Sequence, residues 1–146
     1  MKKLFVVLIA INSTLLWVAC NKDVGNIIKP DTGECKTTIV NQQAFDSAKV
    51  DAFEFVNVFI NENCLFIKVQ HAGGCGGSTF QLYGSGIVLE SYPPATALKL
   101  GFINNDPCEA YLTETIQFDL APLQALSDGE IALRIEGFET NLLYTY

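Results

Sequence analysis

The sequence predicts an all-β domain, either an antiparallel sandwich or a partly closed barrel of about eight short strands. Apolar and polar residues alternate in several separate runs, which is typical of strands that place one face in a core. Gly, Pro, Asn and Asp residues stand between these runs, and no helical pattern of apolar residues extends over about ten positions. The 146 residues are 49% hydrophobic and 17% charged, a composition typical of one folded domain.

The runs that predict strands are short and follow one another along most of the chain. The clearest is 64–70, which comes directly after a turn at 61–63 and therefore predicts a hairpin. The run 50–60 breaks its alternation at Val56 and Asn57, which predicts a β-bulge. The other strands are expected at 36–40, 78–83, 98–103, 111–120, 131–135 and 142–146.

The segments between the strands are expected to hold little regular structure. Single helical turns are expected in 42–49 and 122–126. The glycines in 84–86 are expected to end the strand before them, and 87–96, which contains two prolines, is predicted to be a long connection.

The N-terminus has the parts of a secretory signal peptide, which we assign to residues 1–19. Two lysines give a positive start, an apolar stretch of about 14 residues follows, and Ala19 precedes Cys20. This stretch is shorter than the ~20 residues that span a membrane, which favours cleavage over an uncleaved anchor helix. A Cys directly after a small residue resembles the lipobox of bacterial lipoproteins, although Trp17 replaces the usual aliphatic residue. We therefore expect Cys20 to be the lipidated first residue of the mature protein.

Lipidation divides the chain into three predicted parts. These are the signal peptide 1–19, a polar and turn-rich tether at 20–34, and a β domain at 35–146. Acyl chains such as palmitate contribute ~0.8 kcal/mol per buried methylene, so the expected membrane partner is reached through the N-terminal lipid. The expected location is the bacterial cell envelope, on its periplasmic or surface face.

The charge balance excludes several classes of function. Nine Lys and Arg residues against 16 Asp and Glu residues give a net charge of -7. Nucleic-acid binding needs a basic face, and so does adsorption to anionic lipid, so neither is expected. The single His leaves few groups for acid–base chemistry or for metal binding, and no cofactor is predicted.

The cysteines form an even set once Cys20 is assigned to the lipid. Cys35, Cys64, Cys75 and Cys108 remain, and four thiols allow three pairings. Export makes two disulfides the expected state. No C-x-x-C spacing is present, which argues against a zinc or redox site, so no metal is predicted.

Strand direction selects one pairing. If consecutive strands run alternately up and down, Cys35 and Cys64 each precede or start an upward strand at one end of the domain. Cys75 and Cys108 then lie in loops at the opposite end. The strand 64–70 rises ~23 Å, which is beyond the ~7 Å Cα limit for a bridge from Cys64 to Cys75. The predicted disulfides are therefore Cys35–Cys64 and Cys75–Cys108.

Two segments around Cys75 and Cys108 hold the candidate chemistry, and each has a structural alternative. His71 and Cys75 match a thiolate–imidazole pair, but a disulfide at Cys75 would remove the thiolate. The glycines of 73–77 match a phosphate-binding loop, but such loops lead into a helix, and this one leads into a strand. We expect its glycines to allow tight turns around a disulfide.

Two further motifs have weaker support. Asn104, Asn105, Asp106 and Glu109 carry oxygen atoms of the kind that bind Ca²⁺, but their spacing is that of an ordinary turn. The triplet 31–33 reads Asp-Thr-Gly, as in aspartic proteases, but it lies in the predicted tether and has no second copy. We expect neither motif to be functional.

The tyrosines offer a possible binding face. Exposed aromatic rings on a sandwich stack on sugars or contact a partner protein, so a carbohydrate or protein ligand is the alternative to ordinary strand composition. The residues expected on the outer faces are Tyr83, Tyr92, Tyr111, Tyr144 and Tyr146.

Several short motifs of the mature chain form a recognisable series: Gly73-Gly74-Cys75-Gly76, Phe80, Asp106-Pro107-Cys108-Glu109-Ala110, Phe118-Asp119-Leu120, Pro122-Leu123, Ile131-x-Leu133-x-Ile135-x-Gly137 and the closing Tyr146. In these motifs most of the mature chain resembles small lipoproteins of the Bacteroidota. The resemblance implies an all-β fold and an envelope location, and it carries no activity. The His that often follows the Gly-Cys-Gly segment in such proteins is absent, so no role for it is transferred.

These observations predict an exported, lipid-anchored envelope protein that acts as a non-catalytic binding or structural module. The alternative is an enzyme or inhibitor whose site is built from the loops near residues 71–77 and 104–109. A pocket with converging polar groups beside these loops would favour the alternative.

Overall fold

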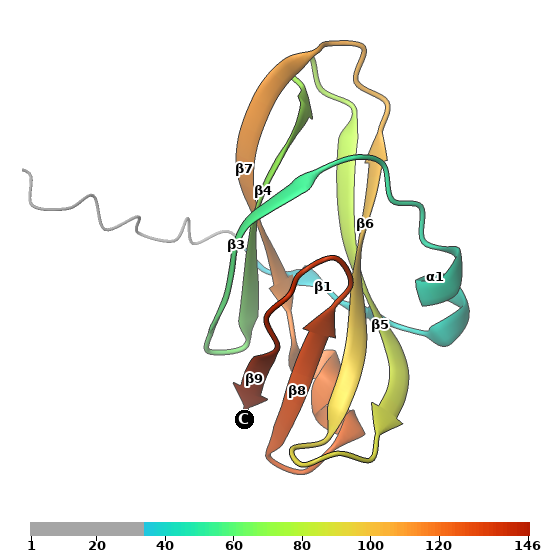
Figure 1. Ribbon diagram of the computed structural model, residues 1–146, viewed down its shortest axis with the longest axis vertical. Coiled ribbons are helices and arrows are strands. Elements are labelled where there is room, and N and C mark those ends of the chain that lie inside the picture. Colours follow the sequence, from blue (N-terminus) through green and yellow to red (C-terminus); the bar gives the residue numbers. More distant parts are fainter. Residues whose placement is uncertain (1–33) are drawn as a thin grey trace, which may run out of the picture. The chain divides into compact units, whose positions relative to one another are not determined.

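The computed structural model describes residues 34–146, and these form a two-layer β-sandwich (Figure 1). One sheet has four strands and the other has five, with a hydrophobic core between them. The two sheets do not close into a barrel, so the sandwich is the correct one of the two predicted architectures. The predicted signal peptide, Cys20, the tether and the Asp-Thr-Gly triplet at 31–33 lie outside the described residues, except that the tether ends at Glu34.

The elements follow the predicted runs closely. In chain order they are β1 (Lys36–Thr37), β2 (Ile39–Val40), α1 (Gln42–Ser47), β3 (Glu54–Asn61), β4 (Cys64–Gly73), β5 (Ser78–Leu89), β6 (Ala95–Asn104), β7 (Ala110–Asp119), the 3₁₀ helix η1 (Ala121–Leu126), β8 (Glu130–Ile135) and β9 (Leu142–Thr145). Within this part of the chain no helix is long and apolar enough to cross a membrane.

The strand order shows mixed sheets where antiparallel ones were predicted. The first sheet is ordered β1-β7-β4-β3 and the second β2-β5-β6-β8-β9. Three pairs are parallel, namely β1 with β7, β2 with β5, and β6 with β8. The chain changes sheets in the connections after β1, β2, β4, β6 and β7, so strands that are consecutive in sequence are often not neighbours.

The predicted strand 36–40 is divided between the two sheets. Lys36 and Thr37 pair with the end of β7, whereas Ile39 and Val40 pair with the middle of β5. Thr38 lies between them, is buried, and donates a hydrogen bond from Oγ1 to the Asp119 carbonyl oxygen at 2.6 Å. This short crossing segment therefore bridges the edges of both sheets.

The connection predicted at 87–96 is wrong in its length, because β5 continues to Leu89 and β6 begins at Ala95. The glycines of 84–86 do not end the strand. They form an irregularity in the pairing between Gly84 and Val88, after which pairing resumes. The hydroxyl of buried Ser85 lies 3.3 Å from that of Thr96 in the facing strand, which satisfies two polar groups at this irregularity. The predicted bulge in β3, in contrast, is confirmed as a register shift between Phe55 and Asn57.

The core consists of the inward residues of both sheets. The alternation predicted for 64–70 is confirmed, because Leu65, Ile67 and Val69 are fully buried. Tyr144 was expected on an outer face, which is wrong: it is fully buried, and its hydroxyl reaches Asn63 and Gln124 at the edge of the core. The alternation of β9 therefore places this ring inward, with its polar end satisfied.

The two short helices occupy the predicted segments. Asn41 caps α1 by accepting a hydrogen bond from the Ala44 N–H at 2.9 Å, and α1 buries Phe45 against the second sheet beside β5 (Figure 1). Pro122 lies in the first turn of η1, where the fixed backbone angle of proline is compatible with a helix.

Candidate functional site

The two disulfides are at opposite ends of the β4–β7 pair. Cys64 lies opposite Asp119 at one end, and Gly73 lies opposite Ala110 at the other. Cys35–Cys64 bridges the first end and Cys75–Cys108 the second, with Cα–Cα distances of 6.2 Å and 5.7 Å. The predicted pairing is confirmed. Two such bonds indicate that the protein folds in an oxidising compartment outside the cytoplasm.

The predicted strand directions are correct for the long strands and wrong for the first one. The strands β4, β5, β6 and β7 do alternate in direction, although they lie in two sheets. However, β1 runs parallel to β7 and therefore opposite to the predicted direction. Because β1 has only two residues, Cys35 lies near the same end of the domain in either direction.

The loops predicted as an alternative site do meet in space, but their polar groups bind one another. The Asp106 carboxylate accepts hydrogen bonds from the backbone N–H groups of Gly74, Cys75 and Gly76 at 2.8, 3.0 and 2.9 Å. It also accepts one from the Cys108 N–H at 2.9 Å. The Cys108 bond, followed by those from the glycine loop, holds the pKa of Asp106 below its usual value of 3.8.

This arrangement explains the glycines of the loop. Gly74 and Gly76 have φ angles of +125° and +87°, in the region that residues with side chains rarely adopt. These angles turn successive N–H groups toward one point, which is the geometry of an anion-binding nest. The anion in this nest is the Asp106 carboxylate of the chain itself, so the loop is not a free phosphate cradle.

The other chemistry considered for these loops is absent from the described residues. The Cys75 sulfur is bonded to Cys108, so no thiolate is available to pair with His71. The ligand atoms of Cys75, Asp106 and Cys108 lie within 4.8 Å of one another, which is close enough to hold a metal ion. However, both sulfur atoms are joined in the disulfide. The Asn104 side-chain oxygen accepts a hydrogen bond from the Asp106 N–H at 3.0 Å, as expected for a turn.

His71 has a partner that the sequence analysis missed. Its side chain is 1% exposed, and its Nε2 lies 2.7 Å from a Glu114 carboxylate oxygen. Its Nδ1 lies 2.7 Å from the Ala72 carbonyl oxygen, and its ring packs against those of Phe80 and Phe102. Both nitrogens thus lie within hydrogen-bond distance of oxygen atoms of the chain itself. The ring is therefore held by its surroundings and is a structural element.

A signal for this pair was present in the sequence. Glu114 belongs to the same alternating set as Leu112, Ile116 and Phe118, and is thus a charged residue at an inward position. His71 is likewise inward in β4 and pairs with Leu112, two residues before Glu114. The alternation thus indicates the face of each residue, but the contact follows only from the β4–β7 pairing that the structure shows.

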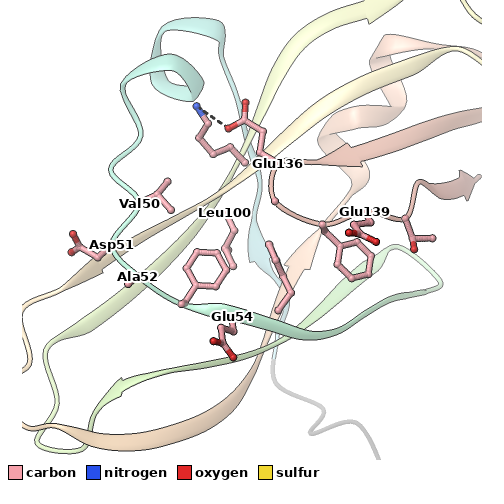
Figure 2. A pocket seen from close by; sticks show the side chains of 13 residues that line it. Val50, Asp51, Ala52, Glu54, Leu100, Glu136 and Glu139 are labelled. Carbon is pink, nitrogen blue, oxygen red and sulfur yellow. Dashed lines mark ion pairs between the residues drawn. The ribbon is translucent and has the colours of Figure 1, made fainter.

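A groove lined by residues of both sheets is shown in Figure 2. Its volume is about 1080 Å³. It is lined by residues 50–55, which lead into β3, by 99–100 of β6, and by 136–140 of the turn after β8. In Figure 2 the residues Val50 to Glu54 lie on one side and Glu136 and Glu139 on the other. This groove was not predicted from the sequence, because its lining residues come from three segments that are far apart in the chain.

Aromatic rings form the apolar part of the groove. Phe53, Phe55 and Phe138 line it and are each partly buried. Phe53 meets Phe55 edge-on with ring centroids 5.0 Å apart, and Phe55 lies 5.6 Å from Phe138. Phe53 also contacts the core ring of Phe102 at 5.9 Å, so the groove floor is continuous with the core.

Among the described residues, Lys99 is the one cation that lines the groove, and Glu136 neutralises it. Lys99 Nζ lies 3.2 Å from Glu136, and Figure 2 marks this ion pair with a dashed line. The same ammonium donates to the Phe45 carbonyl oxygen at 3.0 Å and lies 4.3 Å from the centre of the Phe45 ring. Its side chain is 16% exposed. Lys99 thus holds α1 to the second sheet.

The other carboxylates of the groove differ in their partners. Asp51 accepts a hydrogen bond from the Asn104 N–H at 2.8 Å and pairs with Lys49 at 3.1 Å, and these contacts hold its pKa below the usual value. Glu54 is exposed and accepts a hydrogen bond from the Tyr111 hydroxyl at 3.0 Å. Glu139 is also exposed, and neither it nor Glu54 has an ion-pair partner in residues 34–146.

The predicted tyrosine face is only partly present. Tyr92 is 96% exposed and Tyr111 is 64% exposed, but they lie far apart in the fold, at the β5–β6 turn and at the start of β7. Tyr92 borders a shallow groove of about 360 Å³ that also contains Arg134 and Leu143. Tyr83 is partly buried, and its ring packs over Gly101.

Comparison with known proteins supports the fold and assigns no activity. No protein-family model matches the chain, and no curated protein matches its sequence significantly. Among solved structures, a NigD-like immunity protein from Bacteroides caccae matches with a TM-score of 0.52 and 12% identity, over 75% of this chain and 58% of that one.

Two further solved structures match less well. A protein of unknown function, DUF1344, from Bacteroides vulgatus has a TM-score of 0.49 and 13% identity over 77% of this chain and 57% of that one. A putative toxin-related protein from Parabacteroides distasonis has a TM-score of 0.47 and 15% identity over 77% of this chain and 61% of that one. The chain therefore spans about three fifths of the solved chains it matches, and it shares the overall fold of the Bacteroides caccae protein.

Proposed function

We propose that the chain is an exported, lipid-anchored protein of a bacterial envelope that binds a partner and does no catalysis. The observation that carries this proposal is the groove, whose aromatic floor and exposed carboxylates are available to a ligand. Binding sites are typically concave and mostly apolar, with a few polar groups that set orientation. The groove has these features, and the loop site does not.

The internal bonds of the loops favour binding over the alternative of an enzyme or inhibitor acting from 71–77 and 104–109. A catalytic site needs groups that are free to contact a substrate. Here Asp106 is bonded to four N–H groups, Cys75 and Cys108 form a disulfide, and both nitrogens of His71 face oxygens.

The proposed lipid anchor is supported by the residues before the described domain. Ala19-Cys20 follows an apolar stretch, and the chain resembles small lipoproteins of the Bacteroidota. The two disulfides agree with an exported protein. An immunity role, as named for the Bacteroides caccae protein that shares the fold, is one form of the partner binding proposed here.

The anchor is tested by expressing the full chain in a bacterial host with labelled fatty acid. The wild-type protein should incorporate the label and begin at a modified Cys20, as read by intact mass. Cys20→Ala should lose the label and retain its signal peptide. An unmodified thiol at Cys20 in membrane-extracted protein would refute the anchor.

Binding at the groove is tested with a photoreactive amino acid placed at Thr140 in the producing cells. Thr115, which is also exposed but lies on β7, is the matched control position. A cross-linked species from Thr140 alone, which then binds the purified chain, is the expected result. Cross-links of equal yield from both positions, or none from either, would contradict a binding role for the groove.

A further inference from the structure

We infer that the groove between residues 50–55 and 136–140 binds a basic side chain, lysine or arginine, in a segment of a partner protein. This inference rests on the proposed binding function and adds the chemistry of the ligand. It depends on three features of the groove, namely its charge, its aromatic floor and its size.

The charge of the lining is negative. Four carboxylates line the groove, from Asp51, Glu54, Glu136 and Glu139, against the single ammonium of Lys99. Lys99 and Glu136 neutralise each other, and Asp51 has Lys49. Glu54 and Glu139 remain without an ion pair among the described residues. They belong to two different segments of the lining, and both add to its negative charge, which attracts a cation. The Glu54 carboxylate accepts the Tyr111 hydroxyl on the outer side of the first sheet, whereas Glu139 has no hydrogen-bond or ion-pair partner in the described residues.

The aromatic floor suits the rest of a basic side chain. Phe53, Phe55 and Phe138 offer partly buried rings against which the methylenes of Lys or Arg would pack. The face of an aromatic ring also attracts a cation. The chain uses this same combination beside the groove, where Lys99 Nζ lies 4.3 Å from the Phe45 ring centre and 3.2 Å from Glu136.

The size and charge of the groove select a protein segment over other ligands. A volume of about 1080 Å³ is much larger than one side chain, so a small ammonium ion would leave most of it to water. Acidic sugars and acidic peptides are repelled by the unpaired carboxylates and by the net charge of -7. An extended segment would place one basic side chain over the rings and its backbone along the walls.

The test uses the full chain in detergent and a fluorescent tetra-arginine peptide, with tetra-serine and tetra-glutamate peptides as charge controls. Binding is measured by anisotropy as salt is raised. Tetra-arginine should bind, and the other two should not. The double variant Glu54→Gln/Glu139→Gln should weaken binding about fivefold, the effect of two partly exposed ion pairs.

The matched control is Glu62→Gln/Glu90→Gln, which removes the same charge from two exposed turns away from the groove. It should leave binding unchanged. Equal weakening by both double variants would overturn the inference, because it would reveal attraction to net charge alone. Phe138→Leu should also weaken binding, with its melting temperature recorded so that a loss of folding is recognised.

The outcomes separate this inference from the proposed function. Preference for tetra-serine or tetra-glutamate, lost when the groove is altered, would overturn the basic ligand and leave a binding groove in place. Failure of every peptide to bind would also overturn the inference. The proposed function then depends on the Thr140 cross-linking experiment, which makes no assumption about ligand charge.

Discussion

Two regions of the domain contain acidic residues in loops, namely the loops 71–77 and 104–109 at one end of the β4–β7 pair, and the groove at 50–55 and 136–140. They differ in how their polar groups are bonded. In the loops, the Asp106 carboxylate accepts four backbone hydrogen bonds beside a disulfide. In the groove, Glu54 and Glu139 are exposed and without ion pairs in residues 34–146. Polar groups that satisfy one another stabilise a fold, whereas groups that face solvent over an apolar floor are available to a ligand.

A motif that stands out in the sequence is therefore not always a site that is open to a ligand. The loops have the conspicuous motifs, with five residues of the pattern Gly-Gly-Cys-Gly-Gly and a nearby Asp-Pro-Cys. The groove is lined by ordinary Glu and Phe residues from three distant segments. If the comparison is correct, changes in the loops should affect stability, and changes in the groove should affect binding.

The largest effect is expected from removing the loop disulfide. Cys75→Ala/Cys108→Ala frees two positions separated by 33 residues, and the loop-closure entropy of that length is about 3–4 kcal/mol. Denaturant unfolding of the full chain should show this loss of unfolding free energy. The matched pair Cys35→Ala/Cys64→Ala, with a separation of 29, should lose a similar amount. If Cys75→Ala/Cys108→Ala alone lost a negligible amount of unfolding free energy, the disulfide between the loops would not stabilise the fold.

A smaller effect is expected from the pair of His71 and Glu114, in which the imidazole is buried and the carboxylate is exposed. Glu114→Ala leaves the His71 Nε2 without its 2.7 Å acceptor while its ring stays between Phe80 and Phe102. An unsatisfied buried donor costs about 1–3 kcal/mol of unfolding free energy. Thr115→Ala, the next residue on the outer side of β7, is the control and should cost much less. Equal losses would show that the pair contributes no more than strand propensity.

The third prediction concerns acid stability. Because the pKa of Asp106 is lower in the folded protein than its usual value, its carboxylate stabilises the fold above that value. This contribution should be lost as the pH falls through the folded pKa, so the urea midpoint should decline as the pH drops below 3.8. Asp106→Asn should have a lower midpoint at neutral pH and a shallower decline in acid. An identical decline in both proteins would assign the acid sensitivity to other carboxylates, of which Asp51 is the first candidate.

Particular residues show how far the sequence predicts this structure. The strand positions and the disulfide pairing were predictable because Leu65, Ile67 and Val69 alternate in one run and because strand direction places each Cys at an end. The parallel pairing of β6 with β8 was not predictable, since it depends on where the chain changes sheets. The groove was not predictable either, because Phe53 and Phe138 are far apart in the sequence and line one groove only in the folded domain.

The smallest effect on stability is expected from the two exposed carboxylates of the groove. Glu54→Gln/Glu139→Gln should change the unfolding free energy by less than about 0.5 kcal/mol, as for exposed positions without a structural role. Glu139 has no hydrogen-bond or ion-pair partner to lose in the described residues, and glutamine at position 54 still offers an oxygen to the Tyr111 hydroxyl. Thermal unfolding at neutral pH measures this, with Asp106→Asn alongside as the carboxylate that does stabilise the fold. A loss as large as that of Asp106→Asn would mean that the groove carboxylates are structural, and the distinction between the two regions would fail.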